Sequence, residues 1–313
     1  MTNYNLREVY GRTLVELGKE NPNVVVLEAD LGKSTMSCYF EEAFPNRFFE
    51  MGFAEANMTS FAAGLALTGK IPFTNSFAVF AAGRSYDQIR TGICLPSLNV
   101  KIVGSSAGLS DYGDGSTHQT VEDIAIMRAI PNMTVLVPAD AIETAKMTRA
   151  IAAYNGPVYL RITRSELPNV SSADEPFVIG KPMLVRDGRD VVVFATGAMV
   201  ALALEAATAA EADGLSLRVV NVSSLKPVDE DALRAFAKGM RGIVTAEEHS
   251  LIGGLASIVT YAFRGGSLPT VCVGIADKFG QSAENIDVLM EAYGLTAAEI
   301  RKAALQAASK KAA

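Results

Sequence analysis

The first pattern along the chain is a stripe of apolar residues near the N-terminus. These residues recur at intervals of three and four, which predicts an amphipathic helix, and they are Leu6, Val9, Tyr10, Thr13, Leu14 and Leu17. The segment NPNVVVLEADLG then predicts a turn, a buried strand and a loop. Residues 54–67 predict a helix rich in small side chains that ends at Gly69, and residues 73–77 predict the next strand.

Strand and helix patterns continue to alternate after this point. Strands are predicted in NVKIVGSS, MTVLVP and PVYLRI. Helices are predicted in the segment containing RSYDQIR, in TVEDIAIMRAI and in ADAIETAKMTRAIAAY. Apolar strands that alternate with amphipathic helices indicate a mainly parallel sheet with helices on both faces.

A segment rich in proline and small polar residues, SELPNVSSADEPFVIGKP, interrupts the alternation and predicts a linker. Beyond it, strands of a second sheet are predicted in DVVVFATG, LSLRVVNV, RGIVTAEE and PTVCVGI. We therefore expect an α/β protein with two domains, residues 1–170 and 188–313, joined by a linker at residues 171–187. Each domain is expected to hold a mainly parallel sheet flanked by helices.

Composition narrows the classes of function. The 313 residues carry a net charge of −6, which argues against nucleic acid or an anionic membrane as the main partner. The sequence shows no apolar signal segment and no run of about 18 apolar residues that would span a membrane, so we expect a cytoplasmic protein. Three scattered cysteines are typical of free thiols in a reducing compartment. Two histidines are too few for a histidine-rich metal site.

One carboxylate stands out in an apolar segment. Glu55 is the single charged residue in AEANMTSFAAGLAL. A carboxylate in such a setting costs free energy unless it has a partner or a task, so Glu55 is a candidate site residue. In open parallel sheets, ligands bind beyond the carboxyl ends of strands, which singles out the loops ADLGKS, NSFAVF, SSAGLSDYGDGSTHQ and RITRSELP.

The longest of these loops, residues 105–123, is glycine-rich and acidic and carries His118 before a predicted helix. Thr120, with Asp123 three residues later, fits a loose capping box for that helix. A histidine here can exchange hydrogen bonds with a substrate hydroxyl near neutral pH, and Asp114 lies one short turn away; the alternative is an ordinary loop. The sequence GDG can form part of a metal and diphosphate site when an asparagine pair follows it farther along the chain. No such pair stands at the required distance here, so we assign no metal site to this GDG.

Arginines and aromatic residues complete the set of candidates. Arg161 and Arg164 follow a predicted strand, and Arg7 lies off the apolar stripe of the first helix. Arginine matches phosphate in a bidentate fork, although each of the three also fits plain surface charge. The phenylalanines of FTNSFAVF fit a core, but an aromatic ring near a strand end can also stack on a planar heterocycle.

Two segments together resemble a known family. MGFAEANMTSFAAGLAL and DGSTHQTVEDIAIMRAIPNM are similar to the C-terminal half of transketolases. The chain looks most like the smaller subunit of a split transketolase, which is encoded as two chains. The pattern combines a glutamate in GxAExN, an aromatic strand, DGxTHQ and an arginine before xxLP, in this order. The resemblance covers essentially the whole chain and implies a pyrimidine-binding domain followed by a transketolase C-terminal domain.

The resemblance implies thiamine diphosphate as the cofactor. By this resemblance Glu55 contacts N1′ of the aminopyrimidine ring and shares a proton with it, which burial favours. Phe77 or Phe80 packs on the ring, and Asp30 lies at the cofactor pocket. The cofactor supplies the carbanion chemistry, while the protein binds and orients it.

The implied reaction transfers a two-carbon ketol unit from a ketose phosphate to an aldose phosphate. Arg7, Ser34 and Arg164 match the clamp that this family uses for the sugar phosphate. Asp114 and His118 match residues that contact the hydroxyls and the carbonyl end of the sugar. Pentose-phosphate recycling is the default role, although specialised sugar pathways use the same machinery.

Two features depart from a full transketolase. Ser106 stands where many members have a histidine, which leaves the sugar specificity open. The chain also shows no diphosphate-binding domain, the domain that holds Mg²⁺ or Ca²⁺ in this family. We therefore expect inactivity alone, a partner chain that carries that domain and the metal ligands, and an α2β2 assembly. His249, in EEHSLIGGLAS, is expected to be an exposed or interface residue rather than a catalytic one.

Three other interpretations stay open. A 1-deoxyxylulose-5-phosphate synthase shares the glutamate, the HQ loop and the arginines, but it is normally one chain that includes the missing domain. The β subunit of 2-oxo-acid dehydrogenases is a separate chain but lacks the DGxTHQ pattern. A non-catalytic regulatory subunit of the same fold is disfavoured because Glu55, His118, Arg7 and Arg164 are retained.

Overall fold

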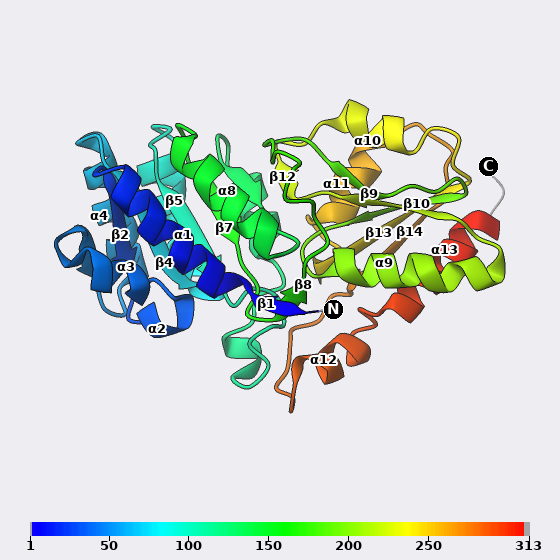
Figure 1. The fold of residues 1–313 in the computed structure, drawn as a ribbon, viewed down its shortest axis with the longest axis horizontal. Coiled ribbons are helices and arrows are strands. Elements are labelled where there is room, and N and C mark those ends of the chain that lie inside the picture. The colour runs from blue at the N-terminus through cyan, green and yellow to red at the C-terminus, as the bar shows by residue number, and fades with distance from the viewer. Residues whose placement is uncertain (1, 310–313) are drawn as a thin grey trace.

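A computed structural model describes residues 2–309 and contains two α/β units side by side (Figure 1). The strands are β1 (Asn3–Asn5), β2 (Val24–Glu28), β3 (Phe48–Glu50), β4 (Ile71–Phe77), β5 (Lys101–Ser105), β6 (Thr134–Leu136), β7 (Val158–Arg161), β8 (Glu166–Pro168), β9 (Met183–Arg186), β10 (Val191–Ala195), β11 (Leu217–Asn221), β12 (Ser224–Lys226), β13 (Gly242–Ser250) and β14 (Thr270–Ile275).

The α-helices are α1 (Leu6–Glu20), α2 (Gly32–Thr35), α3 (Cys38–Ala43), α4 (Glu55–Leu67), α5 (Ala78–Gly83), α6 (Tyr86–Gln88), α7 (Asp123–Ala129), α8 (Ala141–Ala153), α9 (Met199–Ala210), α10 (Glu230–Phe236), α11 (Leu255–Ala262), α12 (Ile286–Ala292) and α13 (Ala297–Ser309). Short 3₁₀ turns are η1 (Pro45–Arg47), η3 (Gly115–Thr117) and η4 (Glu211–Asp213), and η2 (Ile89–Cys94) is a π-helical segment.

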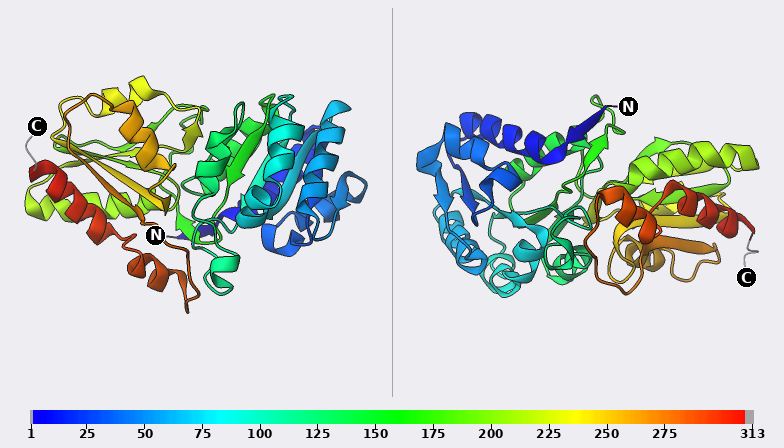
Figure 2. Two further views of the ribbon diagram at one scale, coloured as in Figure 1. Left: turned by 180° about the vertical axis from the view of Figure 1, so that it is seen from behind. Right: turned by 90° about the horizontal axis from the view of Figure 1, so that it is seen from below.

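The first sheet has seven strands in the order β12-β6-β7-β5-β4-β2-β3, and all its pairings are parallel except β12 with β6. Its central strands are buried on both faces, as the run VVVLE of β2 illustrates. Helices α1 and α8 pack on one face, whereas α4, α5 and α7 cover the other (Figures 1 and 2). This is the parallel, doubly covered sheet that the alternating pattern predicts.

The second sheet has five strands in the order β14-β13-β10-β11-β9, with only β9 antiparallel. Helices α9 and α13 pack on one face, and α10 and α11 on the other (Figure 1). Strand β9 lies inside the segment predicted as a linker, and β12, which follows β11 in the second half, completes the first sheet. The two units are thus joined by strand pairing as well as by the linker.

A small antiparallel ribbon fixes the start of α1. Strand β1 pairs with β8, which follows shortly after the end of β7. The side chain of Asn5 caps α1 by accepting hydrogen bonds from the N–H groups of Arg7 and Glu8. The ribbon therefore holds the first turn of α1, and with it Arg7, close to the carboxyl ends of the central strands.

Two local predictions differ from the structure. The segment containing RSYDQIR is helical as predicted from Tyr86 onward, but the short α6 continues directly into the π-helical η2 instead of remaining α-helical. Thr120 does not cap α7; it forms an isolated bridge with Gly108, and the helix begins at Asp123, whose side chain bonds Tyr159 and Arg161. None of the helices within residues 2–309 combines the length and the apolar character needed to cross a membrane.

Candidate active site

Loops from four parallel strands, β2, β4, β5 and β7, meet at the carboxyl edge of the first sheet. These are the four loops that the sequence predicts. The segments after β2, β4 and β5, together with the one that leads from β3 into α4, border a cavity of about 260 Å³, lined by Leu31, Phe53, Glu55, Phe80, Arg84, Thr117 and His118.

Glu55 is the first residue of α4 and is only 3% exposed. Its Oε1 accepts a hydrogen bond of 2.7 Å from Nη1 of Arg84, whose side chain is 53% exposed. The Arg84 guanidinium also lies over the Phe80 ring, 4.1 Å from the ring centroid. A flat N–H-bearing group thus lies between the carboxylate and an aromatic face. No pattern in the sequence indicates this ionic partner for Glu55.

Phe77 and Phe80 occupy different places. Phe80 lines the cavity, whereas Phe77 is buried beside it, with ring centroids 6.1 Å apart and ring planes at 17°. The His118 ring meets Phe80 edge-on at a centroid distance of 5.3 Å. Asp30 is exposed and does not line the cavity, which its neighbour Leu31 does. The geometry therefore brings Glu55, Phe80 and His118 together and leaves Asp30 at the margin.

Two arginines form a second group at the same edge. Nη1 of Arg7 donates to the main-chain carbonyl oxygen of Ser34 (2.8 Å), and Nη1 of Arg164 donates to Oδ1 of Asp111 (2.8 Å). Burial and the nearby charge of Arg164 lower the pKa of Arg7. Arg7, Ser34 and Arg164 are thus brought together as predicted from the resemblance, but the contact made by Ser34 is through its backbone. Asp111 was not a predicted site residue.

Residues 106–120 connect the two groups. Asp114 is exposed and His118 is half-buried on this loop. Both lie near Asp111 and influence its pKa. Burial raises the pKa of Asp111 and the charge of Asp114 raises it further, whereas Arg164 and His118 lower it. Ser106, the departure from the family pattern, is fully buried at φ 50°.

The second half of the chain holds this loop. Glu248 accepts a hydrogen bond of 2.7 Å from the N–H of Leu109. The amide of Gln119 donates to the carbonyl oxygen of Gln281 (3.1 Å), and the N–H of Ala283 donates to the carbonyl oxygen of Tyr112 (2.9 Å). Through these contacts the C-terminal half helps to shape the site, although none of its side chains up to residue 309 lines the Glu55 cavity.

Two candidate residues lie elsewhere. Arg161 is 4% exposed and binds Asp123 through Nε, so it is a structural cation rather than an anion ligand. His249 is fully buried at the junction of the two units, where Nε2 accepts from the N–H of Ala125 and Nδ1 donates to the Ser250 carbonyl oxygen. Burial lowers the pKa of His249 to about 4. Of the two expected positions, exposed or at an interface, the exposed one is wrong, because His249 is an interior residue of β13 that contacts α7.

Residues 2–170 match the family model "Transketolase, pyrimidine binding domain", and residues 180–308 match "Transketolase, C-terminal domain". A "Putative transketolase C-terminal section" from Methanocaldococcus jannaschii is 44% identical over 97% of this chain and 96% of its own length. The chain belongs to the transketolase family. It represents the C-terminal section of a split enzyme. A solved structure, "Split gene transketolase, inactive beta4 tetramer", also indicates this, since it is 48% identical with a TM-score of 0.90. The match covers 99% of this chain and 100% of that one.

Two further transketolase relatives differ in the sugars for which they are named. A 6-deoxy-6-sulfo-D-fructose transketolase subunit from Clostridium sp. is 41% identical over 98% of this chain and 95% of its own length. A subunit of an apulose-4-phosphate transketolase from Phocaeicola vulgatus is 35% identical over 97% of each chain. Membership of this split-transketolase group therefore does not fix the sugar.

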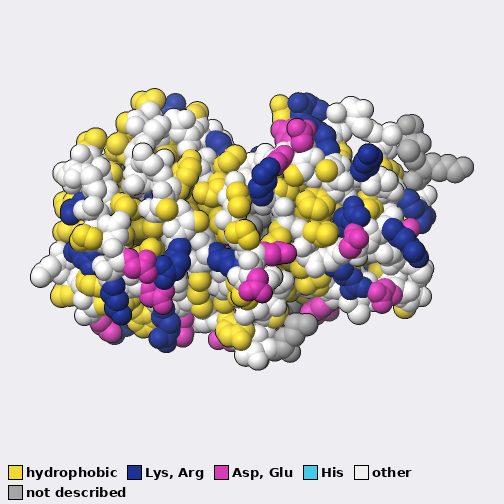
Figure 3. Space-filling model, turned by 45° about the horizontal axis from the view of Figure 1, so that its top comes forward, with side chains coloured by type: hydrophobic (Ala, Val, Ile, Leu, Met, Phe, Trp, Pro, Cys, Tyr) yellow, Lys and Arg dark blue, Asp and Glu magenta, His cyan; other side chains and the backbone are white. Residues whose placement is uncertain are grey.

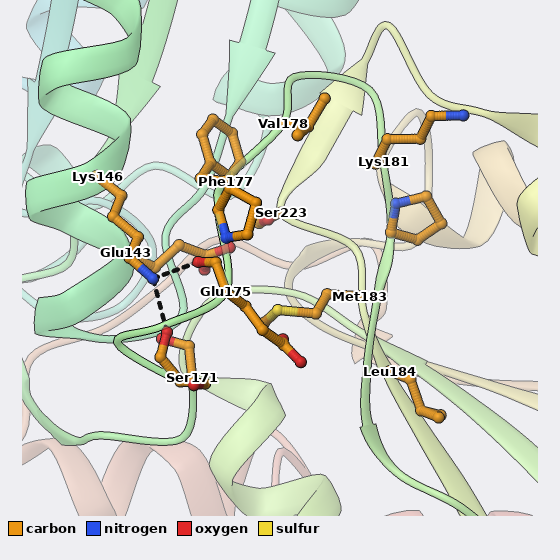
Figure 4. A pocket seen from close by; sticks show the side chains of 13 residues that line it. Glu143, Lys146, Ser171, Glu175, Phe177, Val178, Lys181, Met183, Leu184 and Ser223 are labelled. Atoms are coloured by element: carbon orange, nitrogen blue, oxygen red, sulfur yellow. Dashed lines mark hydrogen bonds between the residues drawn. The ribbon is translucent and has the colours of Figure 1, made fainter.

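A different cavity, of about 320 Å³, lies between α8, the linker and β9 (Figure 4). Two of its polar side chains are held by the chain itself: Nζ of Lys146 donates to the carbonyl oxygens of Ser172 and Glu175 in the lining, and Glu143 accepts from the N–H of Ala139 and the amide of Asn221 behind it. Burial raises the pKa of Glu143 to about 7. None of its lining residues borders the Glu55 cavity, so we regard this region of the transketolase chain as a structural junction.

Proposed function

We propose that this chain is the subunit of a thiamine-diphosphate-dependent transketolase that binds the cofactor's aminopyrimidine and the sugar. The reaction is transfer of a two-carbon ketol unit from a ketose to an aldose that carry anionic tails, with pentose-phosphate recycling as the default role. One observation carries the proposal. The Arg84 guanidinium bonds Glu55 while lying against Phe80, so the cavity accepts a flat group that offers an N–H to Glu55.

The residues of the cavity fit an aminopyrimidine. Glu55 is buried, and a carboxyl group in such a setting can share a proton with a ring nitrogen. Phe80 offers an aromatic face for the ring, with Phe77 behind it, and Asp30 lies at the margin. The bound cofactor supplies the carbanion chemistry that ketol transfer requires. Glu55 orients the ring and sets its protonation, which is how this chain takes part in catalysis.

His118 and the two arginines suit the sugar. Oγ1 of Thr117 lies 3.0 Å from Nδ1 of His118, which leaves Nε2 for a hydroxyl or carbonyl oxygen of the substrate. Arg7 and Arg164 are suited to the anionic tail, and the exposed Asp114 is suited to sugar hydroxyls.

A partner chain completes the proposed enzyme. Within the described residues 2–309 no group of three or more His, Cys, Asp or Glu side chains is arranged to hold a metal ion. We place the diphosphate site and its Mg²⁺ or Ca²⁺ on an N-terminal subunit, in an α2β2 assembly. The relative named as one subunit of an apulose-4-phosphate transketolase supports such a partner, and the β4 tetramer of a split-gene homologue supports self-association.

Exposed apolar side chains support the association of this chain with a partner subunit and with its own copies. One group lies on or beside α4 and includes Phe53 at 75%, Leu67 at 74% and Leu95 at 77%, while others, such as Phe279 at 80%, lie on the second domain. On the face shown in Figure 3, the upper part of the first domain likewise carries many hydrophobic and few charged side chains. Surfaces of this kind mark sites of protein association.

Reconstitution tests the proposal. The purified chain with thiamine diphosphate and Mg²⁺ is expected to be inactive, and addition of the N-terminal subunit is expected to give ketol transfer between xylulose 5-phosphate and ribose 5-phosphate. Normal rates from the isolated chain would contradict the partner requirement. Release of CO2 from pyruvate by the complex, without ketol transfer, would instead support a synthase or dehydrogenase.

A further inference from the structure

The two arginines of the proposed tail site have different surroundings. Arg7 donates to a neutral backbone oxygen, whereas Arg164 forms an ion pair with Asp111. The side chain of Asp111 is completely buried, while that of Arg164 is 43% exposed. In this pair the buried carboxylate of Asp111 holds the guanidinium of Arg164, whose outer part stays open to solvent.

The cluster also retains unused hydrogen-bonding capacity. Nε of Arg7 is buried without a hydrogen-bond partner among residues 2–309. Oδ2 of Asp111 is likewise buried and, in this described part of the chain, accepts no hydrogen bond. Buried polar groups are normally paired. Nε of Arg7 is a donor that an anionic tail can use, whereas Oδ2 of Asp111 is an acceptor that suits a hydroxyl of the sugar, so the cluster has the character of a site prepared for a ligand.

We propose that Asp111 is a specificity-determining residue that lowers the net charge of the Arg7–Arg164 pair from two to one. The site is thereby tuned to a singly charged sugar tail, such as a sulfonate, relative to a doubly charged phosphate. The inference rests on the proposed function, because it concerns the sugar that the same site binds. It also addresses what the relatives leave open, since one is named for a sulfo-sugar and another for a sugar phosphate.

Other carboxylates near the pair act more weakly. Glu8 and Glu166 also influence Arg7, but Glu166 is exposed and the Glu8 side chain is 43% exposed. Water and salt screen exposed charges, whereas a buried charge keeps most of its effect. Asp111 is thus the carboxylate that dominates the potential at the tail, and Glu166 is a natural control.

The test compares two substrates in the reconstituted complex. The ratio of kcat/KM for fructose 6-phosphate to kcat/KM for 6-deoxy-6-sulfofructose is measured for the wild type, Asp111→Asn and Glu166→Gln. Removing one buried negative charge is expected to raise this ratio about fivefold in Asp111→Asn. The exposed Glu166→Gln change is expected to alter it by less than about twofold. An equal fall of both values in Asp111→Asn, with the ratio unchanged, would mean that Asp111 only supports the loop, and would overturn the proposal.

A binding measurement separates this inference from the proposed function. Calorimetric titration of the same complexes with the two sugars reports their relative affinity without turnover. A shift toward the phosphate sugar in Asp111→Asn, in a complex that transfers no ketol unit, would sustain the role of Asp111 while refuting the transketolase reaction. If the complexes transferred the ketol unit but Asp111→Asn shifted neither the relative affinity nor the kcat/KM ratio, the transketolase reaction would be sustained and the role of Asp111 refuted.

Discussion

Buried charges occur in two regions of this molecule, and their partners differ in exposure. At the junction of the domains, Asp123 accepts hydrogen bonds from Nε of Arg161 and from the hydroxyl of Tyr159, and all three side chains are almost fully buried. At the carboxyl edge of the first sheet, Glu55 and Asp111 are equally buried, but their arginine partners are about half exposed.

This difference separates structural charges from functional ones. A buried pair whose members are both enclosed is committed to the fold, since removing one member strands the other. A buried carboxylate with a half-exposed partner can exchange that partner for a ligand, as proposed for Glu55, or hold it while its outer part binds the ligand, as proposed for Asp111. We therefore expect changes at the junction to alter stability and changes at the sheet edge to alter activity.

The largest effect is expected for Glu55→Gln. Glutamine keeps the shape of the side chain but neither ionises nor shares a proton with a ring nitrogen. Ketol transfer by the reconstituted complex should fall by about 10²- to 10⁴-fold, the range for loss of a proton-transferring group. Because Arg84 is half exposed, the free energy of unfolding should change by less than about 1 kcal/mol. Near-normal activity in this variant would remove Glu55 from the mechanism.

Arg161→Met should give the opposite result. It leaves Asp123 buried without its cationic partner, and loss of one member of a buried pair costs about 3–5 kcal/mol. Denaturant unfolding of the purified chain measures this loss. The matched comparison is Arg164→Met, which also leaves a buried carboxylate, Asp111, but lets water take the place of a half-exposed arginine, so the loss should be clearly smaller than in Arg161→Met. If both variants were equally destabilised, the distinction between the two regions would not hold.

A further junction residue, Glu143, predicts a pH dependence. Burial raises its pKa from 4.5 to about 7 in the folded chain. Between these values the folded state keeps a proton that the unfolded state has lost, so the free energy of unfolding falls as pH rises. The whole shift corresponds to about 3 kcal/mol.

Comparison with Glu143→Gln isolates this contribution. The variant lacks the titrating group, so its stability should decline less than that of the wild type between about pH 4.5 and pH 7. Glu28 and Glu247 also have pKa values raised to about 7 by burial, but they remain in both proteins and cancel in the difference. Parallel stability profiles would show that Glu143 is not protonated in the fold.

The sequence predicts the sheet architecture because burial leaves a local pattern. Strand β10 is apolar throughout, β2 is apolar up to its last residue, Glu28, and α1 carries its stripe at helical spacing. Strands β9 and β12 were missed because they are short and pair across the chain, and pairing partners leave no periodic signal. The change from α-helix to π-helix between α6 and η2 was missed for a related reason, since RSYDQIR contains neither proline nor glycine to mark it.

The site was predictable where residue type and family pattern agree, as for Glu55 and His118. Phe77 and Phe80 could not be separated from the sequence, because only the turn from β4 into α5 decides which ring faces the cavity. Arg84 and Asp111 were missed because their significance depends on a partner far along the chain. Hydrogen bonds of this kind join residues 29 and 53 positions apart, and no local pattern encodes them.

Arg84 provides the smallest predicted effect. Its guanidinium occupies the space between Glu55 and Phe80 where we place the aminopyrimidine, so it must move when the cofactor binds. An exposed or half-exposed ion pair is worth about 1 kcal/mol or less, and this is the competition that the cofactor has to overcome. Arg84→Ala in the reconstituted complex should therefore bind thiamine diphosphate more tightly, by up to about fivefold.

Calorimetric titration with thiamine diphosphate measures this change, with Arg90→Ala as the control because Arg90 is an exposed arginine of the neighbouring η2 segment. The control should leave the affinity unchanged. Weaker binding in Arg84→Ala would mean that the arginine stays beside the cofactor and helps to hold it. In that case Glu55 would belong with the junction charges, as a carboxylate with a permanent partner, and the division between the two regions would have to be redrawn at this residue.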